Sequence, residues 1–287
     1  MRVLGIITSY RRLGNTEILV KEALLEAQKL GAEVHAIRLP KLTVKVCKAC
    51  YHCFYEECKL GDDVDWVFEE IAKSDAVVLG TPTYILSVPG ILKMVMDRVL
   101  SLFPKAERFR RKPAALIVTA GLRGWEGFAV PMASLFLLIQ GFRIIDRLVA
   151  YATGPGEILM DEEVIGRARE MGAKIIRALK GEKILPKTEE NECPICGSRA
   201  LEIRGDVARC PICDLTGKIE ISNGRIRIKF PEDPYEHSKW TEEEWREHFE
   251  WLKWTVQEYF RKRSQIEQLR AKYASFDPFI SPTKSRE

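Results

Sequence analysis

Short apolar runs that alternate with helical patterns most constrain how this chain can fold. Each run is followed by a segment with apolar residues at helical spacing, the last from Asp161 to Leu179. Strands that alternate with helices predict a doubly wound parallel sheet of the α/β class, because each crossover helix covers one face of the sheet. The five runs that read as buried strands are 3–8, 33–39, 75–80, 113–120 and 143–152.

The same periodicity predicts where the first three helices lie. They are expected at 17–30, 63–73 and 89–103, with Leu30 on the inner face of the first and Asp62 able to cap the second. The third should begin at Pro89, since proline suits the first turn of a helix.

The loop after the first strand opens directly onto a helix. At such a junction, backbone N–H groups and the helix dipole point at an anion, which makes this loop a candidate phosphate cradle. The candidate ligands are Ser9, Arg11, Asn15 and Thr16. The loop carries neither the G-x-G-x-x-G fingerprint nor the G-K-[ST] ending of a P-loop. The alternative is that Asn15 and Thr16 only cap the helix.

Two more loops leave the carboxyl ends of the third and fourth strands. The first contains Pro82, Thr83, Tyr84 and Ser87, and the second begins at Gly121 and is rich in glycine. Ligands of doubly wound sheets bind beyond these ends, at the point where the strand order reverses. Under a flavodoxin-like strand order all three loops meet there. They suit FMN, with one loop each for its phosphate, its ring face and its ring edge.

A run of cysteines follows the second strand. Cys47, Cys50, Cys53 and Cys58 are spaced C-x2-C-x2-C-x4-C. A thiolate at every third residue lets one short loop wrap around a cubane, as in the C-x2-C-x2-C run of bacterial ferredoxins. Zinc sites usually pair two separate C-x2-C knuckles, so the spacing favours a [4Fe–4S] cluster over the alternatives of structural zinc or free thiols.

The loops also resemble those of a known family. Residues 8–11 and 14–17 look like the FMN-phosphate motif of the NADPH-dependent FMN reductase superfamily. Residues 80–84 and 87–90, followed by 92–93 and 97–98, resemble its flavin-ring loop and helix. With the cysteine run ahead of 62–63, the chain is similar to the archaeal-type iron–sulfur flavoproteins over about residues 1–180.

The two expected cofactors imply a function. FMN takes electrons as a hydride pair or singly, and a [4Fe–4S] cluster carries one at a time. We therefore expect an electron-transfer oxidoreductase that couples two-electron flavin chemistry to one-electron carriers, with NAD(P)H or a ferredoxin as its redox partner. The resemblance implies a homodimer or homotetramer in which the cluster of one subunit approaches the flavin of another.

A second cysteine quartet lies beyond the flavin domain. Cys193, Cys196, Cys210 and Cys213 are spaced C-x2-C-x13-C-x2-C, and two such knuckles around one tetrahedral Zn²⁺ form a zinc ribbon. A rubredoxin-type iron site is the alternative. The ribbon strands are expected at 201–204, 218–221 and 225–230, with a hairpin turn at 223–224. The predicted domains are an FMN-binding domain at 1–184, the ribbon at 188–230 and a helical extension at 231–287.

The extension should contain one long helix. Residues 241–244 form a capping box, and an apolar stripe follows at helical spacing. Four of the six tryptophans fall in residues 240–254, which is more aromatic surface than a helix leaves exposed to water. The helix either docks on its own chain or forms a subunit interface.

Charge and cysteine use limit the remaining classes. A net charge of +4 without a basic block does not require nucleic acid, and no apolar run reaches the length of a membrane span. Two metal-type quartets leave no cysteine for disulfides, and no signal peptide precedes the first strand, so a cytoplasmic protein is expected. Two other functions stay open. One is a cluster-free NAD(P)H-dependent FMN or quinone reductase, and the other is a zinc-ribbon binding or sensor module on a flavin domain.

Overall fold

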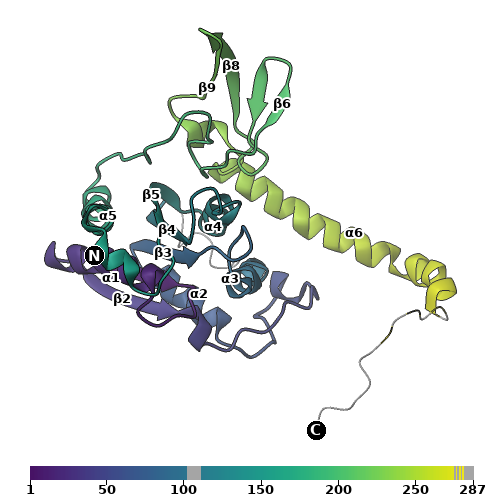
Figure 1. The fold of residues 1–287 in the computed structure, drawn as a ribbon. Coiled ribbons are helices and arrows are strands. Elements are labelled where there is room, and N and C mark those ends of the chain that lie inside the picture. Colours follow the sequence, from purple (N-terminus) through teal and green to yellow (C-terminus); the bar gives the residue numbers. More distant parts are fainter. Residues whose placement is uncertain (102–110, 275, 277, 279, 281–287) are drawn as a thin grey trace. The chain divides into compact units, whose positions relative to one another are not determined.

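The computed structural model describes residues 1–101, 111–274, 276, 278 and 280. Among these residues, five parallel strands form one sheet in the order β2-β1-β3-β4-β5 (Figure 1). This is the flavodoxin-like order that the sequence predicts. The strands are β1 (Arg2–Ile7), β2 (Glu33–Arg38), β3 (Ala76–Pro82), β4 (Pro113–Ala120) and β5 (Arg143–Tyr151).

Each face of the sheet carries its own apolar cluster. Alternation along β1 divides its side chains, with Val3 and Ile7 on one face and Leu4 and Ile6 on the other. The first face is covered by α1 (Asn15–Lys29) and α5 (Glu162–Leu179). The second is covered by α2 (Val64–Lys73), α3 (Gly90–Met96) and α4 (Ala129–Leu138).

Two glycines allow α1 to lie close to its neighbours. A Cβ at Gly80 would lie 2.3 Å from Cγ2 of Val20, so α1 packs directly on the backbone of β3. A Cβ at Gly172 would lie 2.1 Å from the carbonyl oxygen of Ala23, so α5 crosses α1 with the two backbones in contact. This close packing fixes the N-terminus of α1 beside the carboxyl ends of β1 and β3.

Some expected elements differ in extent. Helix α3 ends at Met96, although it was expected to reach Phe103, which itself lies outside the described residues. Leu30 follows α1 and is 43% exposed, so its assignment to the inner face was wrong. Helix α2 begins at Val64, one residue later than expected.

The second sheet is antiparallel, in the order β6-β7-β8-β9. Asn223 and Gly224 join its last two strands with φ values of 52° and 73°, as the predicted tight hairpin requires. Strand β7 was missed because its three residues are too few for a visible alternation. The strands are β6 (Glu202–Arg204), β7 (Val207–Arg209), β8 (Thr216–Ser222) and β9 (Arg225–Lys229).

The chain divides into two compact units, Met1–Thr241 and Glu242–Glu287. The first unit joins both sheets, because the cysteines of the second quartet belong to the same apolar cluster as Phe136 and Ile144. The boundaries expected at 184–188 and at 231 stay predictions.

The second unit contains α6 (Glu242–Ala274), the single long helix that the sequence predicts. Along it, the rings of Trp245 and Phe249 stack with their centroids 5.6 Å apart. Trp251 and Trp254 are 54% and 53% exposed. Whether this helix forms a subunit interface stays a prediction.

Candidate functional site

The loop between β1 and α1 forms the first part of the site. Ser9 is buried, and its Oγ accepts a hydrogen bond from the N–H of Arg11 at 3.3 Å. The Arg11 side chain is exposed, and Leu13 adopts a left-handed backbone with φ of 51°. A tight turn that delivers the chain to a helix N-terminus is the geometry of a backbone anion site.

Two charged residues that sequence reasoning missed brace this loop. The carboxylate of Glu17 accepts the N–H of Leu13 at 2.9 Å and pairs with Lys21 at 2.8 Å. Arg38, from the end of β2, lies 3.6 Å from Glu17 and donates to the carbonyl oxygen of Tyr10 at 3.3 Å. Burial opposes ionisation of Glu17, but the hydrogen bonds from Lys21 and Leu13 prevail and lower its pKa.

Asn15 and Thr16 turn inward instead of toward the loop. Asn15 donates to the carbonyl oxygen of Gly154 at 2.9 Å and accepts from the N–H of Ile158 at 3.3 Å. The hydroxyls of Thr16 and Thr119 share a buried hydrogen bond of 2.7 Å. Neither side chain caps α1, whose N-cap is Gly14, so the alternative that they serve as helix caps was wrong.

The loop after β3 is a tight hairpin. Tyr84 and Ser87 exchange backbone hydrogen bonds of 2.8 and 3.1 Å, and the two residues between them have φ values of 47° and 60°. The N–H of Thr83 donates to the carbonyl oxygen of Thr119 at 2.7 Å. Pro82 ends β3 and is half-buried, whereas Tyr84 is 43% exposed.

The hydroxyl of Thr83 supplies a test of cofactor fit. Its Oγ1 is buried and has no hydrogen-bond partner in the part of the chain that the structure describes. A buried hydroxyl without a partner is costly, and a polar ligand atom within hydrogen-bond distance would remove that cost. FMN, with a polar ring edge and a phosphate, offers groups that suit this hydroxyl and the turn between β1 and α1.

The loop after β4 locks onto the loop after β3. The N–H of Phe128 donates to the carbonyl oxygen of Leu86 at 2.7 Å. Gly127 has φ of 47°, and a Cβ there would lie 2.5 Å from that same oxygen. Gly121, at the start of the loop, is exposed.

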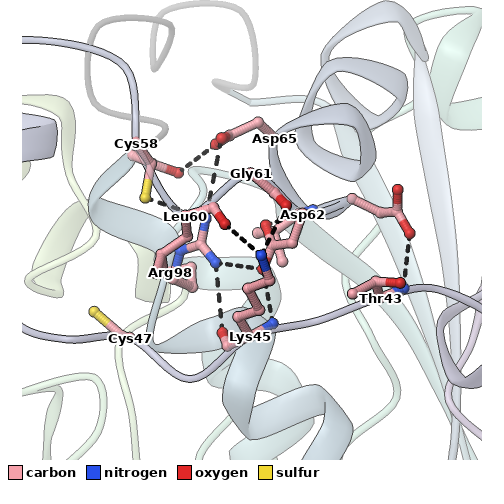
Figure 2. A network of polar contacts seen from close by, with 12 residues as sticks. Thr43, Lys45, Cys47, Cys58, Leu60, Gly61, Asp62, Asp65 and Arg98 are labelled. Atoms are coloured by element: carbon pink, nitrogen blue, oxygen red, sulfur yellow. Dashed lines mark hydrogen bonds and ion pairs between the residues drawn. The ribbon is translucent and has the colours of Figure 1, made fainter.

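The cysteine loop lies between β2 and α2, and polar contacts close its base (Figure 2). Thr43 and Asp63 exchange hydrogen bonds of 2.7 and 3.0 Å. Nζ of Lys45 donates to the carbonyl oxygens of Leu60 and Gly61 at 2.8 and 3.1 Å, and its N–H donates to Asp62 at 2.7 Å. The two ends of the loop are therefore held together by protein groups.

Arg98, just beyond α3, joins this base and lies between Cys58 and Lys45 (Figure 2). Its Nη1 donates to Oδ2 of Asp62 at 2.7 Å, and its Nη2 donates to Sγ of Cys58 at 3.2 Å. The side chains of Arg98 and Asp62 are 1% and 0% exposed. Burial opposes both charges, but their mutual hydrogen bond prevails, which raises the pKa of Arg98 and lowers the pKa of Asp62.

The cysteines of this loop are more accessible than its base. Cys50 is exposed, and Cys47, Cys53 and Cys58 are of intermediate exposure. Burial, together with repulsion of its thiolate by the other three sulfurs, raises the pKa of the Cys53 thiol to about 11. Within the described residues these four sulfurs do not form a close group of the kind that could hold a single ion.

The sulfurs of the second cysteine quartet do form a close group that could hold a single metal ion. The Sγ atoms of Cys193, Cys196, Cys210 and Cys213 all lie within 4.8 Å of one another, and all four residues are buried. Each knuckle turns tightly, with the N–H of Gly197 donating to the carbonyl oxygen of Cys193 at 2.9 Å. Four converging thiols at this spacing fit one tetrahedral metal ion.

Two residues fasten this metal-type site to the large sheet. Arg147 of β5 donates to the carbonyl oxygens of Pro194 and Ile195 at 3.1 and 2.9 Å, and it pairs with Glu192 at 2.8 Å. The hydroxyl of Tyr235 accepts the N–H of Ile144 at 2.8 Å in the core. The quartet is thereby part of the first unit's interior.

A pocket of about 260 Å³ lies between β5, the loop after β4 and the segment 187–200 that precedes the second sheet. Its lining includes Arg123, Glu126, Tyr151 and Arg199. The guanidinium of Arg123 lies 4.7 Å from the centre of the Tyr151 ring. Burial and the neighbouring Glu126 raise the pKa of Tyr151, which keeps its hydroxyl protonated as a donor.

The flavodoxin-like sheet, together with the match to a family of FMN reductases, defines a flavin-dependent oxidoreductase, a flavoprotein that uses FMN. The chain belongs to the NADPH-dependent FMN reductase family, whose pattern matches residues 1–153.

Several known proteins are similar to this chain. An iron-sulfur flavoprotein of Archaeoglobus fulgidus is 30% identical over 185 residues, which are 60% of this chain and 92% of that protein. An iron-sulfur flavoprotein of Methanocaldococcus jannaschii is 31% identical over 189 residues, which are 63% of this chain and 98% of that protein. A solved structure called flavone reductase superposes with a TM-score of 0.75 over 98% of this chain and 100% of its own, at 22% identity. That likeness concerns the fold, and it extends through the second sheet and α6.

In the described part of the chain, no helix combines the length and apolar character needed to cross a membrane.

Proposed function

We propose that this oxidoreductase couples two-electron chemistry at FMN to one-electron carriers through a [4Fe–4S] cluster at Cys47, Cys50, Cys53 and Cys58. The observation that carries the proposal is the position of α3. This helix begins directly after the loop that would face the flavin ring and is followed by Arg98, which contacts Cys58. Its seven residues rise by about 10 Å. The two redox sites would lie near opposite ends of one short helix, close enough for electron transfer.

The flavin would be held by residues of three loops. Ser9, Arg11 and the backbone of their turn would bind the phosphate, with Glu17 and Arg38 fixing the turn. Pro82, Thr83, Tyr84 and Ser87 would lie against the ring, and Gly121 would lie at its edge. Asn15 and Thr16 stay predicted phosphate ligands, and their hydrogen bonds to Gly154 and Thr119 would also tie α1 to the strands beside it. Bound FMN would supply hydride acceptance and single-electron release.

The cysteine spacing and the openness of the first loop support a cluster there. A single tetrahedral ion requires four converging sulfurs, whereas a cubane spreads its ligands over four irons. The cluster would supply one-electron transfer at potentials set by its surroundings. Cys193, Cys196, Cys210 and Cys213, closed and buried, suit structural zinc that takes no part in electron flow.

The proposal includes redox partners and assembly. NAD(P)H is the expected hydride donor, and a ferredoxin-like protein is the expected one-electron partner. A homodimer or homotetramer would bring the cluster of one subunit toward the flavin of the next. Sedimentation of the protein with both cofactors bound measures the assembly state.

Replacing one cysteine tests the cluster. After anaerobic purification and reconstitution, the wild type should contain about four irons and four sulfides at the first quartet. Cys50→Ser should lose them because serine oxygen is a harder ligand, while FMN stays bound. Flavin reduction by NAD(P)H should survive in this variant, and one-electron exchange with a ferredoxin should collapse.

Cys193→Ser is the matched control, since it removes a sulfur from the other quartet. It should lose zinc and keep the iron, the sulfide and the ferredoxin reaction. Zinc at the first quartet of the wild type, with no iron, would contradict the cluster.

A second candidate is a two-electron reductase of a small organic acceptor that needs no cluster. The pocket that Arg123, Tyr151 and Arg199 help to line favours it, because it lies beside the loop after β4 and offers cationic and phenolic donors. In that case Cys50→Ser would reduce a quinone with NAD(P)H as fast as the wild type.

A further inference from the structure

Arg98 occupies a position that the cofactors alone do not explain. It is a buried cation whose Nη1 donates to the carboxylate of Asp62 and whose Nη2 donates to the sulfur of Cys58. The remaining oxygen of Asp62 accepts the N–H of Val64 at 3.3 Å, so the carboxylate is fixed from several sides. Arginine's planar fork makes such a bridge, which the single ammonium of lysine cannot reproduce.

We propose that Arg98 is a positioning residue that holds Cys58 as a cluster ligand and raises the reduction potential of the cluster. This inference rests on the proposed function, since it requires a cluster at Cys58. Hydrogen bonds to the ligand sulfurs and nearby positive charge both stabilise the more negative, reduced state. At 3.2 Å from Sγ, Arg98 supplies both effects from inside the protein, where water screens them little.

Asp62 acts on the same cluster with the opposite sign. Its negative charge lies 2.7 Å from Arg98 and partly cancels that cation. Asp65, 4.0 Å from the guanidinium and 38% exposed, contributes less because water screens it. Removing Arg98 should therefore lower the potential, and removing the charge of Asp62 should raise it. A general loosening of the loop would not produce two opposite shifts.

The experiment measures the midpoint potential of the cluster in reconstituted protein by redox titration followed by electron paramagnetic resonance. Arg98→Gln should change the ratio of reduced to oxidised cluster at fixed potential about tenfold toward the oxidised form. For a one-electron couple this is about 59 mV. Asp62→Asn should shift the ratio toward the reduced form. Arg98→Lys keeps the charge and should recover part of the shift.

Arg167 supplies the matched control. It is an arginine of α5 that pairs with the buried carboxylate of Asp146, with Nη1 2.8 Å from Oδ2. Both residues lie away from the cysteine loop in the sequence and on other elements. Arg167→Gln removes another ion pair to a buried carboxylate and should leave the potential unchanged, even if it lowers the stability of the protein.

The outcomes separate this inference from the function on which it rests. A wild type without iron and sulfide overturns both. A wild type with its cluster, and potentials in Arg98→Gln and Asp62→Asn that stay unchanged or shift in the same direction, overturns the role of Arg98 and leaves the function standing. If Arg98→Gln loses iron but keeps FMN, retention of iron in Arg167→Gln supports the role in holding Cys58. Equal loss of iron in Arg167→Gln contradicts it.

Discussion

Among single residues, Thr83 separates flavin binding from folding. Its buried Oγ1 lacks a partner among the described residues, so Thr83→Val removes an unsatisfied polar atom and keeps the side-chain shape. The free energy of unfolding of the flavin-free protein should rise by about 1 kcal/mol. The affinity for FMN should fall about tenfold, because a hydrogen bond to the ligand is lost. Chemical denaturation without flavin and fluorescence titration with FMN measure the two effects.

Thr119→Val is the control for this substitution. The hydroxyl of Thr119 shares a hydrogen bond with Thr16, so its removal should lower the stability of the flavin-free protein. If Thr83→Val leaves the affinity for FMN unchanged, the proposed contact between Thr83 and the flavin ring is wrong.

The chemistry of the residues was easier to predict than their partners. Cysteine spacing singles out two quartets, and hydroxyls at strand ends single out the loops. Glu17, Arg38 and Arg98 could not be recognised as structural, since a charged residue on a helix or at a strand end is ordinarily solvated. The partner of Arg98 at Cys58 lies 40 positions away, and no local pattern connects the two.

Among the elements, the interlock of two loops makes Gly127 indispensable. Gly127→Ala would force a Cβ to 2.5 Å from the carbonyl oxygen of Leu86 and would strain a left-handed backbone. The loops after β3 and β4 should separate, with a loss of about 1–3 kcal/mol of stability and of most FMN binding. Gly124→Ala is the control, because Gly124 has φ of 79° but nothing within 4 Å of its Cβ. Calorimetry and flavin retention compare the two variants, and equal effects would mean that backbone strain, not the interlock, matters.

The buried strands are the elements that the sequence predicts best. Strand β4 runs from Pro113 to Ala120 as expected, because proline and glycine bound an uninterrupted apolar run. Helix α3 was expected to continue past Met96, since its apolar spacing continues. The chain turns there and Arg98 reaches Asp62, a tertiary contact that outweighs local propensity.

At the scale of the whole first unit, the second cysteine quartet should stabilise the entire unit, and not only the small antiparallel sheet beside it. Its sulfurs lie in one apolar cluster with α4 and β4, and Arg147 and Tyr235 fasten the two sheets together. Cys193→Ser, or removal of the metal by a chelator, should therefore lower the melting temperature of the entire unit. Limited proteolysis should cut on both sides of residue 188. Cleavage confined to 188–230, with an unchanged melting temperature for the remainder, would instead support the separate domains that the sequence suggests.

The closed base of the cysteine loop bears on the order in which the protein is assembled. Thr43, Lys45, Asp62 and Arg98 bring the loop ends together without any metal. The entropy cost of closing the loop is then incurred when the protein folds. A cluster that binds afterwards would have to order only the segment between the two loop ends. The buried quartet presents the opposite case, since its four thiols converge only inside the folded core, so binding of an ion there is coupled to folding. Under the proposed function, zinc would accordingly bind as the core forms, and the cluster would be delivered afterwards to a folded protein, with exposed Cys50 as the first sulfur within reach of a carrier.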